Sequence, residues 1–587
     1  MALRRGIGFV FVLIGLAAFV SIAGILLLYL LVSREPSIAQ QSTLVLRPGG
    51  ELHEVVPDDV VGQFIRSDSP TVRGFVDSLR KAKRDPRITS VLLMPSPLQL
   101  PFWGKVQELR DAVIDFRKSG KTVVAYLEYG GDREYYLASA ADRVFLLPSS
   151  PLDLAGVASY EIFLRGTLDK IGAYPDFLRI GEYKTAPNQL TQKSFTPAHR
   201  NMAESLNRDM YGQLVRGIAD ARHKTEAEVR QLLDQGPFLP EDALRAGLVD
   251  DLAYEDQLDD RVRQLKPANG KPRRVESSDY QRVSLGTVGI RPRSRIAVIY
   301  AVGVIASGKS GYDPVNGAVT GSETLVEQIR RARDDASIKA IVLRIDSPGG
   351  SSIASDVIWR ELMITRDHQP SRPLVASMSD LAASGGYYIA MPGQVIVAQP
   401  ATLTGSIGIY TGKIVTGGTM TKLGVTAEEV KSGRNADINS PFKPFSPEQR
   451  AKMQDYLQGF YDQFVERVAQ SRHTTPERID AVAQGRVWTG QQAREVGLVD
   501  VLGGLDTAVT IAKQRAKIPP EEDVDLVIYP PRRSLYAALA ERFGGGASAL
   551  SEWLGAGDRR ALAALTAPVR LFRRGEPLAL MPFAFVR

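Results

Sequence analysis

The 587-residue chain contains no cysteine and only five histidines, which are scattered along it: His53, His199, His223, His368 and His473. The absence of cysteine excludes disulfide bonds, thiol catalysis and metal sites built on thiolates. No histidine lies within residues 379–410, the stretch that carries the candidate nucleophile, so the sequence does not suggest a histidine base. The net charge of +7 is small for this length and dispersed, and it does not indicate a nucleic-acid-binding surface.

The beginning of the chain has no charged residue from Gly6 to Val32. Such a run is long enough to cross the roughly 30 Å hydrocarbon core of a bilayer as a helix. Arg4 and Arg5 precede it, and the positive-inside rule then places the N-terminus in the cytoplasm and the body of the chain across the membrane. We therefore predict a membrane anchor within residues 1–35. A cleaved signal peptide is the alternative, but its apolar region is usually shorter.

Two halves of the chain repeat one another. Tyr135–Ala138 (YYLA) recurs as Tyr387–Ala390 (YYIA) at an offset of 252 residues, and Gly247–Asp250 (GLVD) recurs as Gly497–Asp500 at an offset of 250. Within each half, short apolar runs alternate with charged segments of helical periodicity, which indicates βαβ units and a mainly parallel sheet. We therefore predict an α/β protein with a first repeat at 40–265, a linker at 266–294, a second repeat at 295–520 and a basic tail rich in Gly, Ala and Leu at 535–587.

A formal nucleotide-binding motif occurs at residues 303–310, where GVIASGKS fits the phosphate-binding P-loop pattern. The P-loop requires a helix to begin at its Lys-Ser pair, so that backbone N–H groups face the phosphates. Here Gly311-Tyr-Asp-Pro follows, which cannot start a regular helix. The predicted topology also places this segment across the membrane from cytosolic nucleotides. We expect neither a nucleotide nor a nucleic acid as a partner.

The candidate nucleophile is Ser384, which follows an apolar run and directly precedes Gly385-Gly386. A serine at such a turn can present its hydroxyl to a cleft, with the next N–H free to bind an oxyanion. Gly349 and Gly350 follow the preceding predicted strand, and both loops should lie at the carboxyl edge of a parallel sheet, where ligands bind. The alternatives are a tight helix entry for the serine and an ordinary βα turn for the glycines.

The repeat indicates which half carries each candidate group. At the 252-residue offset, Ser384 corresponds to Asp132, and Lys184 corresponds to Ala436. The first half therefore lacks the serine, and the second half lacks the lysine. A duplicated enzyme that divides one active site between its copies would show this distribution. Chance would also produce it at any single position, because surface lysines are abundant.

Four motifs together resemble the S49 serine peptidases of the long, duplicated, membrane-anchored signal peptide peptidase A type: LAASGGYY at 381–388, LTGSIG at 403–408, DSPGG at 346–350 and GEYK at 181–184. The resemblance extends from the anchor to about residue 515. It implies a Clp protease/crotonase-like fold in each repeat. It also implies that Ser384 is the nucleophile, that Lys184 is the general base and acid, and that Ser406 hydrogen-bonds the lysine.

The chemistry of a Ser–Lys dyad requires a neutral amine near pH 7, whereas the reference pKa of lysine is about 10.4. Burial in an apolar site disfavours the ammonium form and can lower that pKa by several units. Lys184 would take the proton of Ser384 during attack on a peptide carbonyl and return it to the leaving amine. The N–H groups of Gly349 or Gly350 and of Gly385 would stabilise the oxyanion. We expect no metal ion and no cofactor.

From the resemblance and the anchor we expect a serine endopeptidase of the bacterial inner membrane, with its catalytic body in the periplasm. Its expected substrates are cleaved signal peptides and other short hydrophobic peptides, and its expected assembly is a homotetramer. Two alternatives remain at this stage: a crotonase-like acyl-CoA enzyme and a non-catalytic membrane scaffold of the same fold. The tail after residue 534 suggests no function, since a basic amphipathic helix, a packed helix and a flexible segment fit it equally.

Overall fold

The computed structural model describes residues 35–54, 71–265, 273–313, 317–530, 575–581 and 585–586, together with the isolated positions 16, 19 and 24. Apart from those three positions, the predicted anchor at 6–32 lies outside the described residues. Among the residues that are described, no helix is long and apolar enough to cross a bilayer.

The first repeat is built on a six-stranded sheet in which neighbouring strands are parallel. In spatial order its strands are β10 (Arg273–Glu276), β1 (Ser42–Leu46), β2 (Ile88–Leu93), β3 (Thr122–Leu127), β5 (Arg143–Leu146) and β9 (Asp251–Leu252). Leu44 and Leu46 pack with helices α3 (Val72–Arg84) and α4 (Gly104–Arg117), whereas Val45 packs on the opposite face with α11 (Leu258–Leu265). Apolar runs of this kind are typical of a parallel sheet covered on both faces.

The second repeat reproduces this arrangement. Its parallel strands are, in spatial order, β23 (Val524–Tyr529), β11 (Ser294–Val302), β15 (Ile338–Ser347), β17 (Leu374–Ala383), β18 (Val395–Ala398) and β22 (Val501–Leu502). Strands β19 (Leu403–Gly405) and β21 (Val487–Thr489) extend the sheet beyond the end of β17. Helices α13 (Ser322–Asp334), α14 (Ser352–His368) and α15 (Gly385–Ala390) cover one face, and α20 (Leu505–Arg515) covers the other.

Matching hydrogen bonds show that the sequence repeat is also a structural repeat. The Tyr135 hydroxyl donates to the Leu248 carbonyl at 2.7 Å, and the Tyr387 hydroxyl donates to the Leu498 carbonyl at 2.9 Å. Each copy also contains an equivalent arginine–aspartate ion pair, Arg222–Asp250 in the first and Arg472–Asp500 in the second. The predicted α/β class is confirmed.

Part of the segment predicted as a linker, 266–294, completes the first sheet. Strand β10 pairs with β1 at the sheet edge, and helix α12 (Ser277–Gln281) follows it. Tyr280 of α12 is fully buried, its hydroxyl donates to Asp85 at 3.0 Å, and Lys81 Nζ donates to the Tyr280 carbonyl at 3.1 Å. This segment therefore packs as part of the first repeat as well as connecting it to the second.

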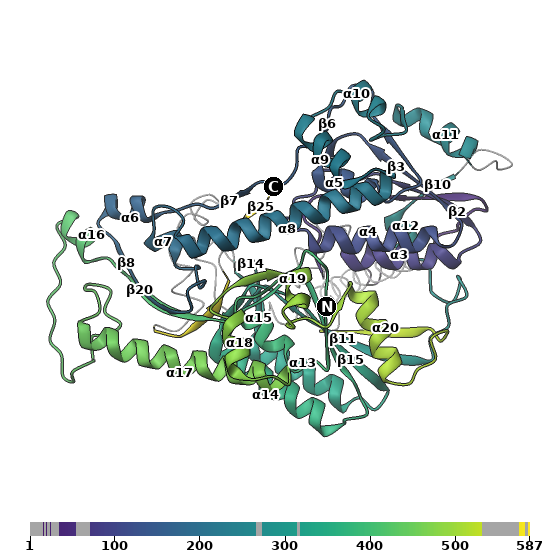
Figure 1. Cartoon of the computed structure of the whole chain (residues 1–587). Coiled ribbons are helices and arrows are strands. Elements are labelled where there is room, and N and C mark those ends of the chain that lie inside the picture. Colours follow the sequence, from purple (N-terminus) through teal and green to yellow (C-terminus); the bar gives the residue numbers. More distant parts are fainter. Residues whose placement is uncertain are drawn as a thin grey trace, which may run out of the picture.

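A third sheet joins three distant parts of the chain. Its strands are, in spatial order, β13 (Gly311–Asp313), β14 (Gly317–Gly321), β12 (Val304–Ala306), β16 (Gly349–Ser351), β24 (Leu578–Leu580), β20 (Ile409–Val415) and β8 (Tyr174–Ile180). Strand β8 of the first repeat pairs antiparallel with β20 of the second along its whole length. Two long helices, α8 (Pro197–Arg222) and α17 (Pro447–Ser471), flank this part of the molecule on opposite sides (Figure 1).

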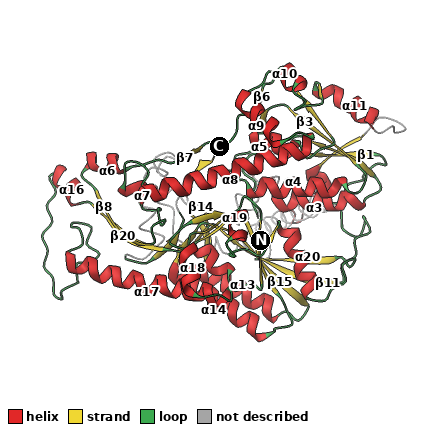
Figure 2. Ribbon diagram, viewed as in Figure 1, coloured by secondary structure: helices red, strands yellow, loops and turns green. Residues whose placement is uncertain are grey.

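The remaining elements complete the helices and strands that Figure 2 shows. They are β4 (Gly130–Gly131), α5 (Asp132–Ala138), β6 (Leu152–Asp153), β7 (Ser159–Tyr160), α6 (Arg165–Ile171), α7 (Asn188–Thr191), α9 (Glu226–Gln235), α10 (Pro240–Arg245), η1 (Glu255–Gln257), α16 (Gly417–Lys422), α18 (Pro476–Val482), α19 (Gly490–Glu495) and β25 (Phe585–Val586).

A buried ionic cluster holds the two repeats together. Arg344 of β15 is fully buried, and its guanidinium donates to Glu54 at 2.8 and 2.9 Å and to Glu108 at 2.6 Å. Both glutamates belong to the first repeat and are themselves buried. Removing one partner of such a cluster leaves the opposite charges buried and uncompensated, which is more costly than losing an exposed ion pair.

The substitution Arg344→Leu should therefore lower the free energy of unfolding by about 3–5 kcal/mol, because two buried carboxylates lose their partner. The shift in the urea or thermal unfolding midpoint measures this. The matched control is Arg360→Leu on the exposed side of α14, which should change stability by no more than about 0.5 kcal/mol. Equal midpoints for the two variants would contradict a stabilising role of the cluster.

Candidate active site

Ser384 lies at a sharp turn between a strand and a helix. Strand β17 ends at Ala383 and α15 begins at Gly385, and the backbone of Ser384 between them has φ 56° and ψ −113°. A positive φ is strained for a residue with a side chain, and such strain is found mainly at functional positions. The Ser384 N–H donates to the Gly405 carbonyl at 2.7 Å, which fixes the turn. Gly386 has to be small, because a methyl group there would lie 2.6 Å from the Ser347 carbonyl oxygen.

The structure brings Lys184 of the first repeat onto this serine. Lys184 Nζ lies 2.8 Å from Ser384 Oγ, 3.1 Å from Ser406 Oγ and 3.0 Å from the Ser406 carbonyl oxygen. All three residues are fully buried. The three side chains predicted to act together therefore form one hydrogen-bonded group, although 200 residues separate the lysine from the first serine.

Burial lowers the pKa of the Lys184 amine well below its usual value of 10.5, because the ammonium form loses its hydration. No carboxylate in the described part of the chain offsets this loss. Lowering the pKa favours the uncharged form of the amine, which has a lone pair available. At 2.8 Å from Ser384 Oγ the amine lies within the hydrogen-bond distance that a general base requires, and its lowered pKa favours the uncharged form.

The loop that carries Lys184 is docked on the second repeat. The Tyr183 N–H donates to the Gln484 carbonyl at 2.7 Å, and the guanidinium of Arg179 donates to the Lys184 carbonyl at 3.0 Å. Gly485 makes the approach possible, since a methyl group on it would lie 2.5 Å from both the N and the Cα of Lys184. The position of the amine thus depends on a glycine of the other repeat.

The predicted oxyanion glycines lie beside the serine. A methyl group on Gly349 would lie 2.6 Å from the Gly385 nitrogen, so the two backbones are in contact. The Gly349 N–H donates to Ser347 Oγ at 3.1 Å, whereas the Gly385 N–H begins helix α15 and has no acceptor within that helix. Gly385 is therefore the better placed donor, and Gly350 is the next residue of β16.

Comparison with known proteins identifies the family. The model of peptidase family S49 matches residues 115–269 and 366–519, one region in each repeat. The chloroplastic serine protease SPPA of Arabidopsis thaliana is 38% identical over 456 residues, which are 76% of this chain and 66% of that protein. Protease 4 of Salmonella typhi is 36% identical over 456 residues, 76% of this chain and 72% of that protein. This chain belongs to peptidase family S49.

Membership of the family makes the chain a serine peptidase, as predicted from the four motifs. The first matched region contains Lys184 and the second contains Ser384 and Ser406. A shorter match, 33% identical over 196 residues, is to the putative signal peptide peptidase SppA of Enterococcus faecium, covering 33% of this chain and 56% of that protein.

Sequence reasoning missed a second buried lysine in this S49 peptidase. Lys105 Nζ lies 2.7 Å from Asp346 and 3.6 Å from Asp380, and the Lys105 N–H donates to Asp380 at 2.8 Å. Asp346 opens the loop with Gly349 and Gly350, and Asp380 lies on the strand that leads to Ser384. Lys105 therefore holds both loops of the site from the first repeat.

The electrostatics of Lys105 are opposite to those of Lys184. Burial alone would lower the pKa of Lys105, but the carboxylates of Asp346 and Asp380 outweigh burial and raise it above the usual value. Burial raises the pKa of Asp380 to about 6, against the lowering effect of Lys105. No sequence pattern marks this lysine, because its partners come from the other repeat.

The P-loop-like segment of the S49 peptidase is not followed by a helix. Residues Gly311–Asp313 after Lys309 and Ser310 form strand β13, and α13 begins only at Ser322. The prediction that no helix starts at this Lys-Ser pair is confirmed.

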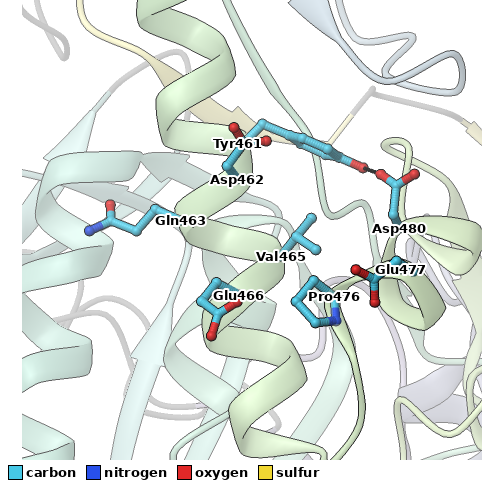
Figure 3. Close-up of a pocket in the computed structure, with 8 residues that line it drawn as sticks. All are labelled: Tyr461, Asp462, Gln463, Val465, Glu466, Pro476, Glu477 and Asp480. Carbon is cyan, nitrogen blue, oxygen red and sulfur yellow. Dashed lines mark hydrogen bonds between the residues drawn. The ribbon is translucent and has the colours of Figure 1, made fainter.

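A hollow of about 630 Å³ lies between α17 and α18, away from the three buried residues of the site. Figure 3 shows that the Tyr461 hydroxyl is hydrogen-bonded to Asp480 at its edge, with Glu466 and Glu477 also among the lining residues. The Tyr461 hydroxyl also accepts the Gln484 N–H at 3.2 Å. This wall of the hollow therefore supports the loop on which Lys184 is docked.

The substitution Gly485→Ala should lower kcat at least tenfold, because the added methyl group displaces the Lys184 backbone from its position. Gly497→Ala is the matched control. Gly497 also has a positive φ, 81°, but a methyl group there meets nothing within 4 Å. Steady-state kinetics on a peptide reporter should show near-normal kcat for Gly497→Ala. A similar kcat loss in both variants would assign the effect to backbone strain alone.

The pH profile of kcat/KM should rise with pH through a single ionisation well below 10.5, because Lys184 as the predicted base acts in its neutral form and its pKa is lowered. Below that pKa the amine is protonated and activity is lost, and above it activity reaches a plateau. Rates measured from acidic to alkaline pH test this. An apparent pKa close to the usual lysine value of 10.5 for this loss of activity would contradict the prediction.

Proposed function

We propose that Ser384 and Lys184 form the catalytic dyad of this S49 peptidase. The observation that carries the proposal is the 2.8 Å contact between Lys184 Nζ and Ser384 Oγ in a fully buried site. The lowered pKa of Lys184 favours the uncharged form that a base requires. An acyl-CoA enzyme or a non-catalytic scaffold would have no use for this arrangement.

In the first half of the reaction, Ser384 Oγ attacks the carbonyl carbon of the peptide bond while its proton passes to Lys184 Nζ. The N–H of Gly385, with that of Gly349 or Gly350, stabilises the negative charge on the carbonyl oxygen. The ammonium of Lys184 then donates the proton to the leaving nitrogen, which departs as the amine product. The remaining half of the substrate stays on Ser384 as an ester.

In the second half, Lys184 takes a proton from water as the water oxygen attacks the ester carbonyl. The carboxylic acid product leaves, and the proton returns to Ser384 Oγ. The contacts at 3.1 and 3.0 Å from Ser406 to Lys184 Nζ hold the amine in place through both halves. Ser406 thus positions the base.

We further propose a Clp protease/crotonase-like fold for each repeat, a membrane anchor at residues 6–32, and a location at the periplasmic face of the bacterial inner membrane. The uncharged run of Gly6–Val32 behind Arg4 and Arg5 supports the anchor and its orientation. Cleaved signal peptides and other short hydrophobic peptides are the proposed substrates, in keeping with the name of the Enterococcus faecium relative. The proposed assembly is a homotetramer.

The substitutions Ser384→Ala and Lys184→Ala should each reduce kcat/KM for a Leu-containing reporter peptide by at least about 10³-fold, because each removes one member of the dyad. Lys193→Ala, at an exposed position of the same repeat, is the control and should retain normal activity. The double variant should be no worse than either single variant, since the two groups act as a unit. Near-normal activity of Lys184→Ala would overturn the dyad even if Ser384 were essential.

A further inference from the structure

Arg486 of the second repeat lies over the loop that carries Lys184. It directly precedes strand β21. Its guanidinium carbon lies 4.7 Å from the ring centre of Tyr183 and 4.5 Å from that of Trp488, so the cation is stacked on two aromatic rings. Its Nη1 donates to Asn201 Oδ1 of α8 at 3.0 Å. The side chain thus joins the start of β21 to two elements of the first repeat.

The backbone of Arg486 holds a second group of the site. Its carbonyl accepts the Ser406 N–H at 2.7 Å, and its own N–H donates to the Ala483 carbonyl at 2.8 Å. Ser406 in turn contacts Lys184 Nζ through its hydroxyl at 3.1 Å and its carbonyl at 3.0 Å. Arg486 therefore contacts the neighbour of the lysine through its side chain and the hydrogen-bond partner of the lysine through its backbone.

The stack of Tyr183, Arg486 and Trp488 reaches the protein surface beside a residue that does not. The three stacked residues are partly buried, whereas Lys184 is fully buried. Tyr183 also packs against an apolar cluster that contains Ala383, the residue before the nucleophile. The stack therefore lies between solvent-accessible surface and the residues of the dyad.

Charged side chains near the loop of Lys184 include Arg179 of β8, Glu182 of the loop itself and Arg486. Arg179 donates to the Lys184 carbonyl at 3.0 Å, and Glu182 is exposed. Among the described residues, no charged side chain bonds to the Lys184 amine. Burial is therefore what favours its uncharged form, and the residues that separate the amine from water affect its basicity.

The first repeat lacks this stack. Residues 484–486 (QGR) correspond to residues 235–237 (QGP) at an offset of 249 residues, and at the same offset Trp488 corresponds to Leu239. The copy that holds no nucleophile thus has neither a guanidinium nor an indole at these positions.

We propose that Arg486 is a positioning residue for the base: stacked between Tyr183 and Trp488, it holds Lys184 against Ser384 and shields the amine from water. The inference rests on the proposed dyad of Ser384 and Lys184. A planar guanidinium can stack on rings and donate hydrogen bonds in its plane at the same time, which a lysine ammonium cannot do. Without the stack, water hydrates the ammonium form, and the pKa of Lys184 rises towards its ordinary value.

The substitution Arg486→Met removes the stack and keeps an apolar side chain of similar length. We expect the acidic limb of the kcat/KM profile to move to higher pH by about one pH unit, so that kcat/KM falls about tenfold along that limb. At alkaline pH the activity should return to near the wild-type plateau, because the deprotonated amine still acts. A variant that had only lost stability would show no such recovery. An unchanged acidic limb would overturn the proposal.

Conservative variants identify the part of the side chain that acts. Arg486→Lys keeps the charge but not the planar stack, and it should move the profile as Arg486→Met does. Tyr183→Phe keeps the ring and should retain the wild-type profile, whereas Tyr183→Leu should move it. Arg478→Met, at an exposed position of α18, is the matched control and should leave the profile unchanged. A wild-type profile in Arg486→Lys, or one profile shared by Tyr183→Phe and Tyr183→Leu, would contradict the stack.

Amide hydrogen exchange separates this proposal from the dyad, because it needs no activity. The Tyr183 N–H donates to the Gln484 carbonyl at 2.7 Å. Arg486→Met should speed exchange of this amide at least about tenfold, and Arg478→Met should leave it unchanged. Equal protection in the two variants would overturn the role of Arg486 whether or not the dyad is correct. Loss of cleavage in Lys184→Ala tests the dyad by itself.

Discussion

The arrangement of the site depends on keeping the amine of Lys184 buried away from solvent. Lys184 and Lys105 both come from the first repeat and both are buried, yet the pKa of Lys184 is lowered and that of Lys105 is raised. The difference lies in their neighbours: hydroxyls and a carbonyl surround Lys184, and two carboxylates surround Lys105. Two neighbouring carboxylates keep Lys105 charged, and the lack of any beside Lys184 favours the uncharged form that the proposed base requires.

Duplication explains how such a site can be closed from two sides. In the second repeat the turn holds Ser384, and in the first repeat the same position holds Asp132, whose carboxylate accepts the N–H groups of Ala155 and Gly156 at 3.1 and 2.9 Å. The first copy therefore uses the position to fix a loop. The first copy has no serine at this position. It contributes Lys184 and Lys105 to the site of the second copy, and its strand β8 pairs with β20.

Features that depend on local sequence or on the repeat could be predicted from the sequence. Contacts between residues of different repeats could not. The α/β class and the two copies follow from periodicity and from the matching motifs, and the resemblance placed Ser384, Lys184 and Ser406 together. Gly485 and Lys105 could not be predicted, because each acts on a residue of the opposite repeat. Strand β10 reads Arg-Arg-Val-Glu, a polar edge strand without an apolar pattern, so its sequence does not distinguish it from a linker. Strand β24 spans only Leu578–Leu580, too few residues for any periodicity.

The position of strand β24 between β16 and β20 bears on two opposing requirements of the site. A peptidase must admit a peptide, but Lys184 must stay out of water to remain uncharged. Main-chain pairing of a strand between β16 and β20 meets both needs, because the paired strand lies against Gly349 and Gly385 beside Ser384. An apolar peptide in this position would exclude water and so help to keep the amine of Lys184 neutral. The proposed preference for hydrophobic peptides and the lowered pKa of Lys184 would thus have one physical cause, the exclusion of water from the site.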